Sequence, residues 1–212
     1  MPHPVLLVRH AVGLRNLAED DGCGELDVYD AKLTRAGRRE AQDHATAVLD
    51  LIRGRAGQEV VVLCSPLRRC LQTCACVLQH ADSVLAFFQP RVSRLLVESS
   101  SYECCSGHSV AYLKQHFSGF DWSAMEQKPD MWWSALYRMD RDRPARALDS
   151  LFAHAEFHPV AAFTHGDLIE RMTGHSFHNC EAVVSFDGGG HWRRYHIGKS
   201  PSRLRAKRRK LC

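Results

Sequence analysis

The sequence lacks any long apolar run. No stretch of about 18 uncharged apolar residues occurs in its 212 residues, so we expect no membrane-spanning helix. The N-terminal stretch "MPHPVLLVRH" has only a short apolar run and no basic residues before it, which argues against a signal peptide. We therefore expect a cytoplasmic protein, and the basic C-terminus raises nuclear entry as an alternative.

Paired metal-binding cysteines are also missing. The chain has nine cysteines, an odd number, and none of them forms a Cys-x-x-Cys pair. Without a secretory signal we expect reduced thiols, and without ligand spacing we expect small buried side chains rather than a zinc site. We assign these cysteines no metal.

Charge is low overall but unevenly placed. The formal net charge is +4, and the last fourteen residues, "KSPSRLRAKRRKLC", carry seven Lys or Arg and no acid, which leaves −3 for the residues before them. Such a segment has almost nothing apolar to bury, so we expect residues 199–212 to be a disordered basic tail. Its partner stays open among nucleic acid, an anionic surface and a nuclear import receptor, and it could equally be a solvated end.

Apolar runs of strand length alternate with helical patterns along the rest of the chain. This alternation predicts an α/β domain over residues 1–198, with a mostly parallel sheet, helices on both faces and a hairpin at the sheet edge near the C-terminus. No internal repeat or linker is visible before the tail. Strands are expected at 5–10, 59–65, 83–89 and 160–166 and in the 182–197 hairpin, and helices at 33–54, 66–81, 109–117, 128–139, 144–157 and 167–175.

Polar residues follow three of the expected strands. They are Arg9 and His10, then Ser65 to Arg69, then Thr164 and His165. Ligands in open α/β sheets bind beyond the carboxyl ends of the strands, so these groups should converge on one pocket. Arginine binds phosphoryl oxygens, and neutral imidazole is a competent nucleophile at neutral pH. The pattern therefore indicates phosphate chemistry.

Five motifs in order resemble the histidine phosphatase superfamily, also called phosphoglycerate mutase-like. They are "LVRHAVGLRN", "LTRAGRREA", "SPLRRCLQT", an isolated glutamate in "RLLVESSS", and "AFTHGDLI". The resemblance covers residues 5 to 175. Ala11 stands where the family usually has glycine and Cys70 where it usually has alanine, both small replacements.

The resemblance implies a phosphohistidine intermediate at His10 and no metal or other cofactor. It places Arg9, Arg69 and His165 around the phosphoryl group. Arg69 rather than Arg68 is chosen because it lies four residues after Ser65. Asn16 and Gly166 are expected to bind substrate, although Asn16 could instead cap the next helix.

The position of the proton donor varies in this family. Glu98 is the leading candidate because it follows "RLLV", and Glu103 is the alternative. An alkoxide is a poor leaving group, so the donor must stay protonated near neutral pH, which requires a pocket that raises its pKa.

These features predict a metal-independent phosphomonoester phosphatase that acts on a phosphorylated small molecule. The sequence has no convincing match to the additional substrate-binding residues of glycolytic phosphoglycerate mutases. This favours hydrolysis over mutase activity. The two alternatives that remain are a phosphoglycerate-type mutase and a weakly active phosphate-binding scaffold module.

If the tail is separate from the catalytic domain, its removal should affect binding to polyanions and not catalysis. Deleting residues 199–212 should abolish salt-sensitive retention on heparin. Turnover of a small aryl phosphate should stay within about twofold, because surface changes rarely perturb a fold by more than about 0.5 kcal/mol. A truncated protein that is folded by circular dichroism but inactive would show that the tail contributes to the active site.

Overall fold

The centre of the computed structural model is a six-stranded sheet in the order β3-β2-β4-β1-β5-β6. The structure describes residues 2–16, 29–52, 59–80, 89–100, 102–126, 133–185 and 191–195. The strands are β1 (Val5–Arg9), β2 (Val61–Cys64), β3 (Arg91–Val92), β4 (Val160–Thr164), β5 (Ala182–Ser185) and β6 (Trp192–Tyr195). The first four run parallel, and β5 and β6 form an antiparallel pair at one edge. The predicted fold class is confirmed.

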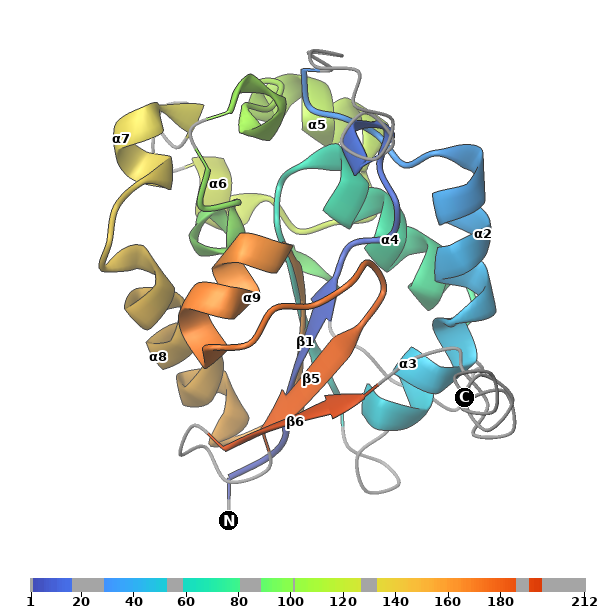
Figure 1. Cartoon of the computed structure of the whole chain (residues 1–212), viewed down its shortest axis with the longest axis vertical. Helices are drawn as coiled ribbons and strands as arrows, with labels where there is room; N and C mark the ends of the chain where they lie inside the picture. The colour runs from blue at the N-terminus through green and yellow to red at the C-terminus, as the bar shows by residue number, and fades with distance from the viewer. Residues whose placement is uncertain are drawn as a thin grey trace, which may run out of the picture.

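Helices pack on both faces of this sheet (Figure 1). They are α2 (Arg35–Asp43), α3 (Ala45–Ile52), α4 (Arg68–Leu78), α5 (Val110–His116), α6 (Ser123–Glu126), α7 (Ala135–Arg138), α8 (Arg143–Ala155) and α9 (Gly166–Thr173). Two short 3₁₀ helices are η1 (Arg94–Leu96) and η2 (Glu103–Cys105). Helices α8 and α9 cover one face, whereas α4 covers the other and is itself packed by α2 and α3.

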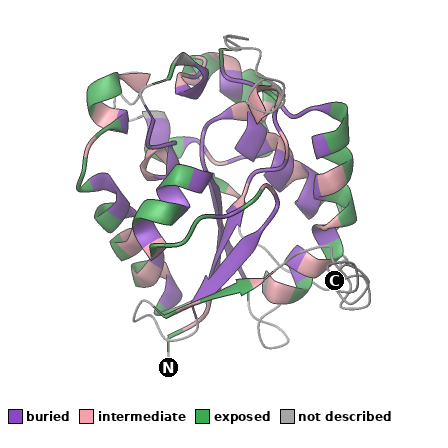
Figure 2. Cartoon of the chain, in the orientation of Figure 1, coloured by how far each residue is buried: buried purple, intermediate pink, exposed green. Residues whose placement is uncertain are grey.

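The alternation of side chains along β1 explains why its sequence is continuously apolar. Leu6 and Val8 belong to the core cluster on the α3 and α4 side, and Val5 and Leu7 belong to the cluster on the α8 and α9 side. Successive strand residues point to opposite faces, so a strand that is covered on both faces has no polar side. Figure 2 shows this burial along the central strands.

The helix expected at 33–54 is two helices with a break at His44. Thr34 caps the first one, since its hydroxyl accepts a hydrogen bond from the Gly37 N–H at 2.8 Å. Ala41 packs in a small cluster beside the loop after β1, whereas Ala45 belongs to the main core. The two halves therefore pack against different parts of the fold, which periodicity alone does not reveal.

Other elements differ from their predicted bounds. The third strand was expected at 83–89, but residues 81–88 lie outside the described residues and the edge strand β3 is Arg91–Val92. Helix α4 begins at Arg68, after Pro66, and the Arg68 N–H donates to Asp30 Oδ1. The described part of the expected 128–139 helix contains only α7, and the predicted tail lies wholly outside the described residues.

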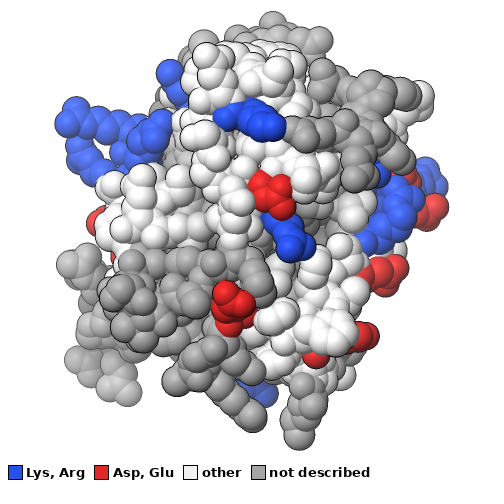
Figure 3. Space-filling view, turned by 180° about the vertical axis from the view of Figure 1, so that it is seen from behind, with Lys and Arg blue, Asp and Glu red and all other residues white. Residues whose placement is uncertain are grey.

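The described surface has scattered charges. On the face seen in Figure 3, Lys and Arg side chains are interspersed with Asp and Glu among uncharged residues. The described part of this face therefore does not present a continuous basic field.

None of the helices within the described ranges is long and apolar enough to cross a membrane.

Gly37 allows α2 to lie directly against the loop after β1. A Cβ at this position would lie 2.1 Å from the Val12 carbonyl oxygen, which is a backbone atom. Alanine normally stabilises a helix by about 1 kcal/mol relative to glycine. We expect Gly37→Ala to lower the free energy of unfolding by about 1–3 kcal/mol instead, because the backbone must move.

Urea unfolding measures this effect, and Gly119→Ala is the matched control. A Cβ at Gly119 meets nothing within 4 Å, so that variant should unfold within about 0.5 kcal/mol of wild type. Equal stability of the two variants would contradict the close approach at Gly37.

Candidate active site

The parallel strands bring the predicted residues together at one small cavity, which five of them line and which His165 and Gly166 do not. Arg9 at the end of β1 pairs in register with Thr164 at the end of β4, so His10 and His165 follow neighbouring strands. Their imidazole rings meet edge to face, with centroids 5.2 Å apart. A cavity of about 90 Å³ beside them is lined by Arg9, His10, Arg15, Asn16, Arg69, Glu98 and Asp167. Five of these seven were predicted, and Arg15 and Asp167 were not.

His10 is held in one tautomer. Its Nδ1 lies 2.8 Å from the Ala11 carbonyl oxygen. A carbonyl oxygen can only accept, so Nδ1 carries the proton and Nε2 has the lone pair. The Arg69 Nε–H donates to that Nε2 at 3.1 Å. Burial, followed by the charge of Arg69, holds the pKa of His10 well below its usual value, so the imidazole is neutral at physiological pH.

His165 is also buried and neutral. Its Nε2 lies 2.7 Å from Ser65 Oγ, and Cys70 Sγ lies 3.4 Å from the same nitrogen. Its Nδ1 lies 3.8 Å from Glu98 Oε2. Burial and then the Arg69 charge hold the pKa of His165 well below its usual value. Ser65 and Cys70 thus fix the ring between β2, α4 and the cavity.

Arg9 and Gly166 form one structural unit. The Arg9 guanidinium donates through Nη1 to the Phe177 carbonyl oxygen. A Cβ on Gly166 would lie 3.0 Å from Arg9 Cζ and 3.1 Å from Nε, so glycine lets the guanidinium lie against the start of α9. Arg9 Nε is buried and has no hydrogen-bond partner among the described residues. Leaving a buried N–H without a partner is unfavourable, and the arginine itself lines the cavity.

Two adjacent cysteines contact the other two arginines of the cavity. Arg15 Nη1 lies 2.6 Å from Cys104 Sγ and 3.5 Å from Cys105 Sγ. Arg69 donates to the Cys104 carbonyl at 3.2 Å and contacts Cys105 Sγ at 3.6 Å. The hydrogen bond shared with Cys104, together with the charges of Arg69 and Arg15, lowers the pKa of Cys105. The Cys105 sulfur contacts both guanidinium groups, and their charge favours its thiolate form.

Glu98 has the environment of a proton donor. Its Oε1 accepts the backbone N–H groups of Ser99 at 2.9 Å and Leu168 at 3.3 Å. Burial, and then the neighbouring Asp167 carboxylate, raise its pKa to about 7. A substantial fraction is therefore protonated at neutral pH. The side chain of the alternative, Glu103, lies outside the described part of the chain.

Arg143 holds the segment that carries Glu98. This arginine is fully buried at the start of α8. It donates to the carbonyl oxygens of Leu95, Val97, Glu98 and Arg138 and to Ser99 Oγ. Sequence reasoning did not identify it, because its role depends on acceptors that converge from other segments.

Asn16 connects two loops at the rim of the cavity. Its Oδ1 accepts from the Gly13 N–H at 2.9 Å and from Asn179 Nδ2 at 3.3 Å. Asn179 Nδ2 also donates to the His10 carbonyl at 3.0 Å. Asn16 therefore lines the cavity and also contacts Asn179, which in turn supports the His10 carbonyl.

A separate group of side chains has the donor types of a metal site. Glu40, His44 and Cys180 bring one ligand atom each within 4.8 Å of one another. None of the three lines the cavity. This group is therefore separate from the cavity.

Several solved structures share this fold. An open reading frame product of Mycobacterium tuberculosis is 18% identical with a TM-score of 0.55, and the match covers 93% of this chain and 98% of that one. Phosphoserine phosphatase of Entamoeba histolytica is 17% identical, with a TM-score of 0.51 and coverage of 94% and 98%. Ecdysone phosphate phosphatase of Bombix mori is 15% identical, with a TM-score of 0.54 and 94% coverage of each chain.

Sequence comparison identifies the family directly. No curated protein matches the chain. The family model described as histidine phosphatase superfamily (branch 1) matches residues 5–182, which is most of the chain. The protein therefore belongs to branch 1 of the histidine phosphatase superfamily.

Proposed function

We propose that the protein is a metal-independent phosphomonoester phosphatase in which His10 is the nucleophile. The observation that supports this most strongly is the neutral His10 imidazole, whose Nε2 lone pair faces a cavity lined by three arginines. The small cavity suits a phosphoryl group, and the rest of the substrate would lie outside it. The phosphatases with a similar fold bear the names of small phosphomonoesters, which supports the same substrate class.

Substrate binding would release the nucleophile. Without substrate, the His10 Nε2 lone pair accepts the Arg69 Nε–H. A phosphoryl oxygen is a stronger acceptor for a guanidinium than a neutral imidazole nitrogen is. Phosphate would therefore take over the Arg69 hydrogen bond and also lie beside the Arg9 guanidinium, which leaves Nε2 free to attack phosphorus.

The reaction would proceed in two transfers. His10 Nε2 forms a bond to phosphorus while the ester P–O bond breaks, and protonated Glu98 gives its proton to the departing oxygen. Water then attacks the phosphohistidine, and the Glu98 carboxylate takes the proton from that water. The P–N bond breaks, phosphate leaves, and both His10 and Glu98 return to their starting states. The arginines and neutral His165 surround the transferred group throughout.

Trapping the covalent intermediate tests this assignment. Reaction with a labelled aryl phosphate should yield acid-labile, alkali-stable phosphohistidine, detected by phosphorus NMR or on an alkaline gel. His10→Ala should abolish the adduct and turnover. His175→Ala changes an exposed histidine after α9 and should retain both. An adduct that persists in His10→Ala would refute the assignment, and turnover with isomer exchange but little phosphate release would favour mutase activity.

The pKa of Glu98 predicts the pH dependence of the first transfer. The acid form is required, and the pKa lies near 7, so kcat/KM for an alkyl phosphate should fall about tenfold per pH unit above that value. Below it, kcat/KM should be flat, because the pKa of His10 is held well below its usual value.

Glu98→Gln should lower kcat/KM for the alkyl phosphate about 10²- to 10⁴-fold and remove the alkaline decline. An aryl phosphate with a good leaving group needs less protonation and should lose less. Glu156→Gln, which changes an exposed glutamate after α8, is the matched control and should behave as wild type. An alkaline decline that survives in Glu98→Gln would assign the acid to another residue.

A further inference from the structure

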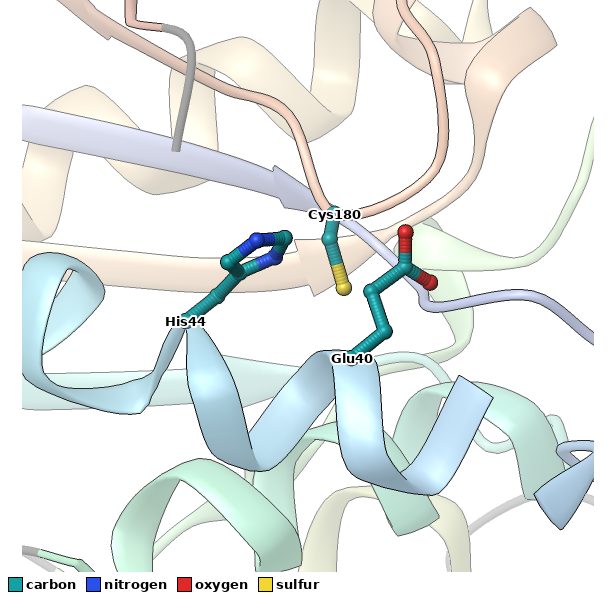
Figure 4. A group of neighbouring side chains, drawn as sticks. All are labelled: Glu40, His44 and Cys180. Atoms are coloured by element: carbon teal, nitrogen blue, oxygen red, sulfur yellow. The ribbon is translucent and has the colours of Figure 1, made fainter. Parts of the chain in front are cut away.

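A mixed set of metal-ligand side chains lies where α2 meets the loop after α9. Glu40 is in α2, His44 immediately follows that helix, and Cys180 comes from the loop before β5 (Figure 4). Glu40 and His44 are four residues apart, so they share one helix face. Their ligand atoms and the Cys180 sulfur all lie within 4.8 Å of one another. In Figure 4 the Cys180 thiol lies between the other two side chains.

Two features of this group are unexplained by packing alone. His44 Nδ1 is buried and has no hydrogen-bond partner among the described residues, which is unfavourable for a ring nitrogen. Cys180 is buried and has a φ of 55°, a backbone conformation that residues with a side chain seldom adopt. Metal coordination would give the orphaned nitrogen a partner and provide a reason for the unusual backbone at Cys180.

Glu40 is already oriented by the backbone. Its Oε2 accepts the Val12 N–H at 3.0 Å. Burial, together with the nearby Glu40 carboxylate, raises the pKa of the Cys180 thiol, so without metal the sulfur keeps its proton. A divalent cation would replace that proton between the sulfur and the carboxylate.

We propose that Glu40, His44 and Cys180 form a Zn²⁺ site that is separate from the catalytic cavity. Thiolate, imidazole and carboxylate are the three ligand types that zinc takes in proteins. The three side chains supply three positions of a tetrahedron and leave the fourth to water. On binding, a sulfur–zinc bond replaces the Cys180 S–H bond, and the proton passes to solvent. Glu40 and His44 are only partly buried, so the site lies near the surface.

The site would brace the segment that carries the proposed nucleophile. The Cys180 N–H donates to the His10 carbonyl at 3.4 Å, and its neighbour Asn179 donates to the same oxygen at 3.0 Å. Glu40 binds the Val12 N–H in the same segment. A zinc ion between Glu40 and Cys180 would therefore cross-link the two supports of residues 10–12. Its role would be structural, because none of its ligands lines the cavity.

Cobalt binding to the reduced, metal-free full chain tests the site. Co²⁺ should produce a thiolate-to-metal charge-transfer band, and one equivalent of Zn²⁺ should remove it. Zn²⁺ should also raise Tm in a concentration-dependent manner. Cys180→Ala should abolish the band. His44→Gln and Glu40→Gln should each weaken binding at least about tenfold, since even the loss of an outer-shell partner has an effect of that size.

Two matched controls separate this site from the other cysteines and histidines. Cys74→Ala changes a buried cysteine in α4, and His175→Gln changes an exposed histidine; both variants should retain the band. A band that survives in Cys180→Ala but is lost in Cys104→Ala would place the metal at the adjacent cysteines Cys104 and Cys105. That result would overturn the proposal. The absence of any band in wild type would overturn it as well.

A measurement on wild type alone avoids dependence on the folding of the variants. Cys180 should react more slowly with an alkylating agent when one equivalent of Zn²⁺ is present, as followed by peptide mass spectrometry. Cys74 reactivity should not change beyond the general effect of stabilisation. Equal slowing at both cysteines would indicate that zinc acts elsewhere on the fold, and it would refute ligation by Cys180.

Discussion

The parallel pairing of β1 with β4 is the constraint on which the whole site depends. Arg9 lies opposite Thr164 in that register, so the next residue on each strand is a histidine at the same edge of the sheet. A shift of one residue in either strand would turn its side chains to the opposite face. The apolar residues of β1 are buried on both faces, which makes such a shift costly. Core packing therefore also fixes the separation of the two imidazoles.

Burial determines the protonation states once these groups have been brought together. Three arginines line the cavity, and two of them, Arg69 and Arg9, disfavour a proton on either histidine. Desolvation acts in the same direction on the histidines and keeps them neutral. The same desolvation acts in the opposite direction on Glu98, because its charged form is the deprotonated one. One buried environment thus favours a neutral base and a neutral acid at the same pH.

The sequence predicted the parts of the site that follow from periodicity and motif order. Buried strands read as apolar runs, and the polar residues directly after them could be assigned to one edge of the sheet. Arg15 and Asp167 were missed although each is one residue from a predicted site residue. The sequence does not show which side chains after β1 or in the first turn of α9 face the cavity. Cys105 was interpreted as a small buried side chain. Its contact with Arg69 requires η2 to fold back over α4, a long-range event without a local pattern.

Segment boundaries failed for a related physical reason. The helical pattern across 33–54 is continuous, but its two halves pack against different clusters, and only the tertiary structure separates them. Arg143 precedes an ordinary helical pattern and gives no sign of burial. Its guanidinium is tolerated inside the protein because several oxygen acceptors from η1, the Glu98 segment and α7 converge on it. Such convergence can be seen only after the chain has folded.

The backbone after His10 shows how the proposed nucleophile is kept rigid. The Ala11 N–H donates to Thr73 Oγ1 at 3.1 Å, and the Val12 N–H donates to Glu40. The Val12 carbonyl accepts the Thr34 N–H at 3.0 Å, and the His10 carbonyl accepts from Asn179.

These contacts come from α2, α4 and the loop after α9, so the loop is supported from several directions without regular secondary structure. Buried backbone groups need partners, and here each partner also limits the movement of His10. The Ala11 carbonyl is left to accept His10 Nδ1–H, so the tautomer of the imidazole follows from the same hydrogen bonds that hold the loop.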